Sequence, residues 1–141
     1  MTFEEKKMDL FTVDDKYYLA HCISLDANMS QGIAVEFEKR FKLRDRLLSM
    51  DNIICPGCVR LDRVFNLITK RYYYGKPTYA TLDITLWHMR RQALDLGVKY
   101  IAMPKIASGL DKLAWGRVKS AIKDIFAGTD IEILICIKPR R

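Results

Sequence analysis

The segment "IEILICI" (131–137) limits the fold more than any other part of the chain. Six of its seven residues are apolar, and such a nearly continuous run is typical of a β-strand that is buried on both faces. A strand of this kind belongs to a largely parallel sheet with helices packed on both sides. The sequence therefore predicts an α/β fold.

Strand-like and helix-like segments alternate along the rest of the chain, as such a fold requires. Further strands are predicted at 3–9, 17–23, 58–62, 64–70 and 99–104, and helices at 32–41, 78–96 and 112–126. The apolar stripe of the longest helix consists of Leu82, Leu86, Met89, Ala93 and Leu96. No repeat, linker or low-complexity segment divides residues 1–141, so we expect one domain. Its predicted architecture is a three-layer α/β/α sandwich with a mixed, largely parallel central sheet.

The charge of the chain favours an acidic ligand. The formal net charge is +7 and the pI is near 9.3, which favours phosphate, nucleotide or nucleic acid. Basic residues are densest in "KRFKLRDR" and "KPRR", which a solvated helix face and a tail also explain. No apolar run approaches the ~20 residues of a membrane span, and "MTFEEKKMDLF" lacks the apolar region of a signal peptide. We expect a monomer in the cytoplasm or nucleus, without a membrane partner.

The four cysteines do not indicate a metal or redox centre. Cys55 and Cys58 form "CPGC", but a zinc site needs further ligands at matching spacing, and the other cysteines and histidines supply none. A thioredoxin-like pair would begin a helix after a buried strand, whereas this one precedes the alternating "VRLDRVF". Because Pro-Gly marks a turn, we interpret the segment as a loop between two strands, and we expect no metal and no cofactor.

Three segments leave the carboxyl ends of predicted strands, where ligands bind in sheets of this kind. They are "SLDANMSQG", "KRYYYGKP" and "KIASGLD". The first and third contain glycine and small polar residues and lead straight into a predicted helix, a combination that suits phosphate. Neither is a Walker loop or a dinucleotide fingerprint, which disfavours a mononucleotide kinase and a dinucleotide oxidoreductase. With the lysine that ends "LITK", these loops favour a ligand that contains a diphosphate.

Short motifs occur in order along nearly the whole chain: "MDLF", "LAHCIS", "GIAVEF", "LITK", "KPTY" and "MPKIASGLD". Their order and spacing resemble the macrodomain family, specifically the branch of the terminal ADP-ribose protein glycohydrolase. "LITK" and "GLD" distinguish this branch from macrodomains without a lysine nucleophile. The resemblance implies a mixed sheet between helices, with ADP-ribose in a cleft along its rim. It also implies an enzyme that removes ADP-ribose from modified acceptors.

The resemblance also implies which residues bind ADP-ribose. Asp9 would accept a hydrogen bond from the adenine amino group, with Leu10 beside it. The residues that line the distal ribose and diphosphate would be Ser24, Gly32, Ile33 and Ala34, and those of the opposing phosphate loop would be Ser108, Gly109 and Leu110.

Lys70 and Asp111 would carry the chemistry. A neutral lysine amine would attack C1″ of the distal ribose, expel the acceptor and form a lysine–ADP-ribosyl adduct. Asp111 would resolve the adduct as a general base or hold the lysine in place. A free lysine titrates near ~10.4, so a reactive amine needs desolvation or cationic neighbours, for which Arg71 and Lys76 are candidates. Structural roles would instead be a strand end that meets water for Lys70 and a helix N-cap for Asp111.

Other residues near these loops receive structural interpretations. We expect Tyr72–Tyr74 to form a mobile lid, with base stacking as a second possible role. His21 is interpreted as a satisfied buried histidine and His88 as a surface residue. Two departures from the family pattern affect the loops: Gln31 precedes Gly32, and Ala107 stands where glycine is usual. Because alanine disfavours a positive φ, the turn at Ala107 must differ or tolerate it.

The acceptor is open at this point. Protein glutamate or aspartate esters lead, and O-acyl-ADP-ribose would undergo the same attack. Related antitoxin macrodomains act on a DNA base, and the basic charge of this chain is compatible with such an acceptor. The sequence is also compatible with a non-catalytic ADP-ribose reader and with a nucleic-acid-binding scaffold.

Overall fold

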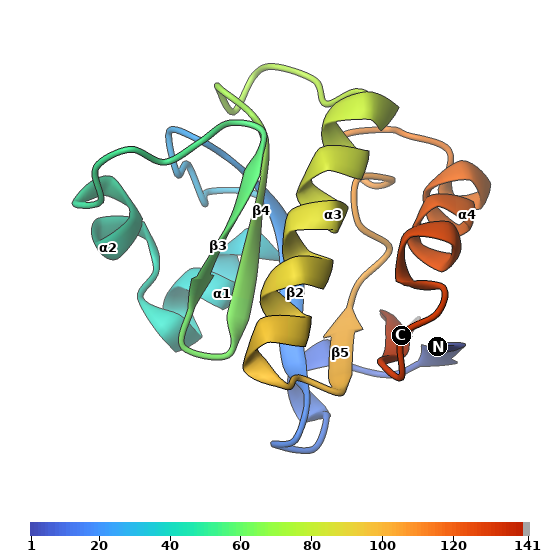
Figure 1. Ribbon diagram of the computed structural model, residues 1–141. Helices are drawn as coiled ribbons and strands as arrows, with labels where there is room; N and C mark the ends of the chain where they lie inside the picture. The colour runs from blue at the N-terminus through green and yellow to red at the C-terminus, as the bar shows by residue number, and fades with distance from the viewer. Residues whose placement is uncertain (140–141) are drawn as a thin grey trace.

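The computed structural model describes residues 1–139 and has one six-stranded sheet between helices (Figure 1). Arg140 and Arg141, which belong to the basic tail "KPRR", lie outside the described residues. The elements in chain order are β1 (Thr2–Lys7), the short 3₁₀ helix η1 (Leu10–Thr12), β2 (Tyr18–Ser24), α1 (Ala34–Phe41), α2 (Arg44–Leu48), β3 (Gly57–Leu61), β4 (Val64–Lys70), α3 (Tyr79–Leu96), β5 (Tyr100–Met103), α4 (Trp115–Phe126) and β6 (Glu132–Ile137).

The sheet confirms the predicted mixed, largely parallel arrangement. Its strand order is β1-β6-β5-β2-β4-β3, and each neighbouring pair is parallel except β3 and β4. β6 lies inside the sheet, between β1 and β5, and residues 133–136 are buried. The continuous apolar run is therefore explained by a strand that is covered on both faces.

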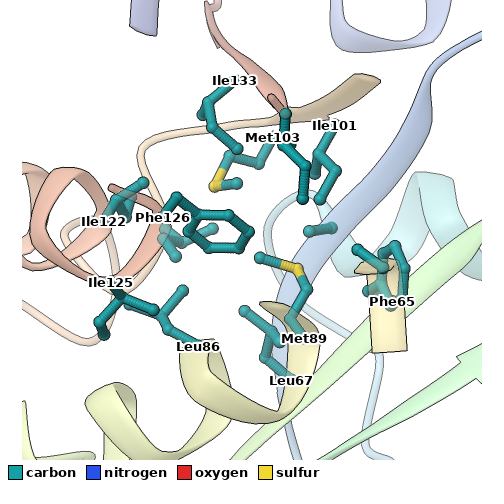
Figure 2. Packing of buried hydrophobic residues seen from close by; sticks show 14 of the residues in the cluster. Phe65, Leu67, Leu86, Met89, Ile101, Met103, Ile122, Ile125, Phe126 and Ile133 are labelled. Atoms are coloured by element: carbon teal, nitrogen blue, oxygen red, sulfur yellow. The ribbon is translucent and has the colours of Figure 1, made fainter. Parts of the chain in front are cut away.

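Two hydrophobic clusters hold the three layers together. In the first, side chains of α3 and α4 meet one face of the sheet; Figure 2 shows Phe126 and Ile122 of α4 gathered with Met89 of α3 over Met103 and Ile133. In the second, α1 and α2 cover the opposite face. Side chains alternate between the two along each strand, as the period of two requires. Both sheet faces are thus closed, and the loops at the strand ends are left to form a site.

Local differences from the predictions have simple causes. A fourth α-helix, α2, begins within "KRFKLRDR" (39–46) and ends beyond it at Leu48. The segment is not merely solvated, because Leu43 within it is buried, as is Leu47 directly after it. Leu96, predicted in the apolar stripe, is 50% exposed. It is the last residue of α3 before Gly97, whose left-handed conformation (φ 71°) ends the helix.

"CPGC" is not a loop between two strands. It follows α2 and its loop, and Gly57 and Cys58 already belong to β3, where they pair with Ile68 and Leu67 of β4. Among residues 1–139 all four cysteines are free, and no three His, Cys, Asp or Glu side chains gather in a way that could hold a metal. In the same range, no helix combines the length and apolar character that crossing a membrane requires.

Candidate active site

A cleft of about 570 Å³ opens at the carboxyl ends of β2, β4 and β5. Its lining comes from the three segments that were predicted to meet at this rim, and Figure 1 shows the loops after β4 and β5 together at one end of the sheet. The predicted site residues that line it are Ser24, Gly32, Ile33, Ala34, Lys70, Gly109, Leu110 and Asp111. The structure brings these eight residues together in one cleft, and their roles toward a ligand stay predictions.

Lys70 and Asp111 form an ion pair in the wall of this cleft. The Lys70 Nζ lies 2.7 Å from the Asp111 Oδ1, and the two side chains are only 15% and 14% exposed. Lys70 is therefore not a strand end that simply meets water. Although 41 residues separate the two in sequence, the parallel neighbours β4, β2 and β5 bring their loops together.

A β-bulge at the end of β4 places the lysine. Ile23 pairs with Ile68, but the next residue of β2, Ser24, pairs with Lys70, so Thr69 is an extra residue. Such a bulge re-aims the side chains beyond it and is frequent beside active sites. The Thr69 hydroxyl faces the Ile23 carbonyl oxygen at 3.5 Å within the sheet. The bulge thus sets Lys70 beside Ser24 at the rim.

Asp111 does not cap a helix. The N-cap position of α4 is occupied by Ala114, without a side-chain hydrogen bond. α4 begins at Trp115, later than predicted, because the preceding residues form a turn in which the Leu113 N–H donates to the Ala107 carbonyl (2.8 Å). The prediction that this segment leads straight into a helix is therefore wrong. The Asp111 carboxylate caps no helix and instead pairs with Lys70.

The loop before α1 has the features of an anion site. Gly32 has a φ of +62°, which glycine adopts without strain. The N-terminus of α1 has no side-chain cap, so its backbone N–H groups can meet an anion. A Cβ at Gly32 would lie 3.4 Å from the Leu110 Cδ1, which shows how closely the two loops face each other.

The lining of the cleft is strongly basic. It includes Lys70, Lys76, Lys105 and Lys112, but Asp111 is its one carboxylate among the described residues. Lys76 donates to the Leu110 carbonyl (3.1 Å), joining the loop after β4 to the loop after β5. Lys105 and Lys112 flank the predicted phosphate loop in the sequence, but they were not predicted as site residues. A diphosphate would find several cations here.

Ala107 keeps the backbone conformation that glycine would favour. Its φ is +59°, so the turn does not differ to accommodate the alanine, and the residue is strained. Its carbonyl accepts the hydrogen bond that closes the turn before α4. The departure from the family pattern therefore leaves the shape of the loop intact.

Two further cleft residues, His21 and Cys22, are held neutral. Burial lowers the pKa of His21 to about 4, partly opposed by its hydrogen bond with Asn66 (Nε2 to Oδ1, 2.7 Å). Its ring stacks on Phe37. Burial, and then the charge of Asp111, raise the pKa of the Cys22 thiol. Neither group offers acid–base chemistry at neutral pH.

Three predicted site residues lie outside the cleft lining. The Asp9 Oδ1 accepts from the Phe11 N–H (2.9 Å) at the start of η1, and Leu10 is buried in the core at 3% exposure. Both follow β1, whose carboxyl end lies on the same edge of the sheet as the cleft. The Ser108 hydroxyl donates to the Lys105 carbonyl (2.8 Å). Their contacts with a ligand stay predictions.

Three exposed tyrosines follow β4, and the middle one lines the cleft. Tyr72, Tyr73 and Tyr74 are 53%, 54% and 69% exposed, and Tyr73 lines the cleft. The rings of Tyr72 and Tyr74 are parallel, with centroids 5.3 Å apart. This position suits either a lid or a stacking surface. His88 is exposed on α3, as predicted.

Comparisons with known proteins find relatives named as ADP-ribose glycohydrolases and solved structures of macrodomains. No protein-family model matches the chain. It is 40% identical over 133 residues to "ADP-ribose glycohydrolase OARD1" of Homo sapiens, covering 92% of this chain and 87% of that protein, and 39% identical to the Bos taurus protein of that name over the same shares. The macrodomain of Mycobacterium tuberculosis DarG superposes with a TM-score of 0.85 at 18% identity, covering 99% of both chains. At that identity, the structural likeness concerns the fold.

Proposed function

The chain belongs to the macrodomain family and is an ADP-ribose glycohydrolase, and we propose that it acts through a covalent adduct on Lys70. The observation that carries the proposal is the Lys70–Asp111 ion pair, 2.7 Å long and largely buried in the wall of the cleft. A nucleophile needs a partner that removes its proton and holds it in place. Asp111 is within reach for both tasks.

The shape and charge of the cleft support one orientation of ADP-ribose. The diphosphate lies between Gly32 at the N-terminus of α1 and the loop that contains Gly109, where backbone N–H groups and lysines favour an anion. The distal ribose then reaches Lys70, and the adenosine extends towards Asp9 at the end of β1.

Two displacements at C1″ complete the reaction. Asp111 takes the Lys70 proton, and the Nζ lone pair forms a bond to C1″ while the bond from C1″ to the acceptor oxygen breaks. The acceptor leaves with that electron pair, and Asp111 returns the proton to solvent. A water molecule then attacks C1″ with Asp111 as general base, and the lysine leaves as an amine.

Carboxylate esters are the acceptors that this cleft favours. A carboxylate leaves as a stable anion and needs no proton from the enzyme. The other candidate acids here are poor ones, because His21 and Cys22 are held neutral and His21 is bonded to Asn66. We therefore propose ADP-ribosylated glutamate and aspartate, and O-acyl-ADP-ribose, as substrates.

A DNA base is the second candidate acceptor. The observation that favours it is the pair of parallel, exposed rings of Tyr72 and Tyr74, in the same loop as the cleft residue Lys76. Exposed aromatic rings bind unpaired bases by stacking, at about 1–3 kcal/mol per base. Equal activity on ADP-ribosylated DNA at low and high salt, or none at all, would remove this candidate.

Intact-mass spectrometry after incubation with ADP-ribose tests the adduct. The wild-type protein should gain the mass of one ADP-ribosyl group, and a Lys70→Ala variant should gain none. A Lys39→Ala variant is the control, because Lys39 is an exposed lysine of α1 that does not line the cleft. It should still form the adduct.

Hydrolysis measured in parallel separates an enzyme from a reader. Lys70→Ala should bind ADP-ribose in calorimetry yet lose hydrolysis of an ADP-ribosylated glutamate peptide. If it binds and hydrolyses like the wild-type protein, the lysine mechanism is wrong. If the wild-type protein binds ADP-ribose but hydrolyses nothing, the chain is a reader.

A further inference from the structure

Asp26 occupies a central position beside the catalytic pair, although no motif in the sequence marks it. It lies two residues after β2, in the loop that leads to α1. Its Oδ1 accepts from the Ser24 hydroxyl and from the Asn28 N–H (3.2 Å), and its Oδ2 accepts from the Tyr73 N–H (3.0 Å). One carboxylate thus joins the end of β2, the loop before α1 and the tyrosine loop.

The Asp26 side chain carries its charge at neutral pH. Burial alone would raise its pKa, but hydrogen bonds from Ser24, Tyr73 and Asn28, together with the charge of Lys70, lower it below the ordinary value for aspartate. An ionised carboxylate has no proton to donate. Each of its hydrogen bonds is therefore one that it accepts.

This charge determines what Ser24 can offer to a ligand. Ser24 is 2% exposed and lines the cleft. A serine hydroxyl has one proton and two lone pairs, and here the proton is committed to Asp26. Only lone pairs remain for the cleft. Ser24 therefore binds a hydroxyl donor, such as a ribose, and repels the oxygens of a phosphate.

Asp26 also restrains the tyrosine loop through two hydrogen bonds. Its own N–H donates to the Arg71 carbonyl (3.2 Å), which extends the β2–β4 pairing past the strand ends. Its carboxylate accepts from the Tyr73 N–H. Because Lys70 directly precedes this loop, the same contacts fix the backbone that carries the nucleophile.

We propose that Asp26 is a positioning residue of the reaction: it makes Ser24 an acceptor for a hydroxyl of the distal ribose and holds the tyrosine loop beside Lys70. The inference rests on the proposed function, because it needs ADP-ribose in the cleft with its distal ribose next to Lys70. It also assigns different parts of the ligand to different residues of the cleft. Ser24 contacts the ribose, and the diphosphate lies against Gly32 and the opposing loop.

Binding of ADP-ribose and of ADP distinguishes this role from a structural one, because only ADP-ribose has the distal ribose. An Asp26→Asn variant keeps the size of the side chain and loses its charge. Its affinity for ADP-ribose, measured by calorimetry, should fall about 10- to 100-fold, as expected for hydrogen bonds to a charged group. Its affinity for ADP should change by less than about threefold.

Two further variants make the test specific. Asp14→Asn is the matched control, because the Asp14 Oδ1 accepts from the Lys16 N–H (2.9 Å) in the same i to i+2 turn, but before β2 rather than after it. It should bind both ligands normally. Ser24→Ala should reproduce the selective loss, and combining it with Asp26→Asn should add less than the sum of the two effects.

The outcomes distinguish a failure of the positioning role of Asp26 from a failure of the proposed function. Equal losses for ADP and ADP-ribose in Asp26→Asn, or no loss for either, would overturn the positioning role. If the wild-type protein forms the Lys70 adduct while Asp26→Asn binds like wild type, the positioning role fails alone. If the wild-type protein binds no ADP-ribose, the proposed function fails as well.

Discussion

Breaking the Lys70–Asp111 pair from one side should destabilise the fold as well as stop catalysis. The two charged atoms lie 2.7 Å apart, and the side chains are 15% and 14% exposed. Removing one member of a fully buried pair costs about 3–5 kcal/mol, and an exposed pair contributes about 0–1 kcal/mol. For this largely buried pair we expect Lys70→Met to lower the free energy of unfolding by about 2 kcal/mol, because Asp111 loses its counter-charge.

The double variant Lys70→Met/Asp111→Asn should recover most of that loss, because it leaves no unpaired charge in the wall of the cleft. Urea unfolding followed by circular dichroism, at neutral pH, measures Lys70→Met, Asp111→Asn and the double variant against the wild-type protein. The coupling between the two sites should be about 1–2 kcal/mol, while hydrolysis stays absent in each variant. Lys112→Met is the control and should change stability by less than about 0.5 kcal/mol.

Two results would refute this reasoning. If Lys70→Met unfolds at the same urea concentration as the wild-type protein or a higher one, the pair contributes no stability. If the double variant is as unstable as Lys70→Met, the loss of stability comes from lost packing of the Lys70 side-chain stem and not from an unpaired Asp111 carboxylate.

Three other predictions concern residues outside the Lys70–Asp111 pair. Because burial lowers the pKa of His21 to about 4 while the unfolded chain takes up that proton near pH 6.5, the free energy of unfolding should fall as the pH drops from 6.5 to 4, by roughly 3 kcal/mol in all. Denaturation across that range should show a flatter pH dependence for His21→Gln. Glu5 accepts hydrogen bonds from the Trp115 Nε1 (2.7 Å) and the Lys119 Nζ (3.0 Å). Glu5→Ala should therefore cost about 1 kcal/mol in urea unfolding, and an undiminished midpoint would show that this link between β1 and α4 contributes nothing. Ala107→Gly should raise the melting temperature, because relief of the positive φ exceeds the added chain entropy by up to about 1 kcal/mol; a lower melting temperature would mean that the alanine is not strained.

The layers of the fold could be predicted because burial leaves a strong signal in the sequence. β6, buried on both faces, reads as an apolar run, and α3 shows its stripe of leucines. α2 could not be predicted in the same way, because its five residues are too few to show a helical period. The start of α4 was misplaced because Asp111 resembles an N-cap by its type and position, while its carboxylate is paired with Lys70.

Prediction of the site from the sequence was limited for a different reason. Lys70 and Asp111 were predicted from motifs, and the distance between them follows from the strand order, which no local pattern contains. Asp26 looks like an ordinary loop aspartate two residues after a strand. One of its partners is the backbone N–H of Tyr73, 47 residues away, and backbone groups carry no sequence signal. Residues that act through backbone contacts are therefore the ones that sequence reasoning misses.

The place of β6 between β1 and β5 has a consequence for the order in which the molecule is made. On the ribosome, residues 2–7 emerge well before their partner in the sheet, residues 132–137. Until then β1 has no neighbour, and Asp9 behind it is not fixed against the rest of the rim. A nascent chain can build the β2–β4 wall and its lysine early, yet it completes this edge of the sheet only after β6 has emerged. Any contact between Asp9 and a ligand therefore requires a chain in which β6 has joined the sheet.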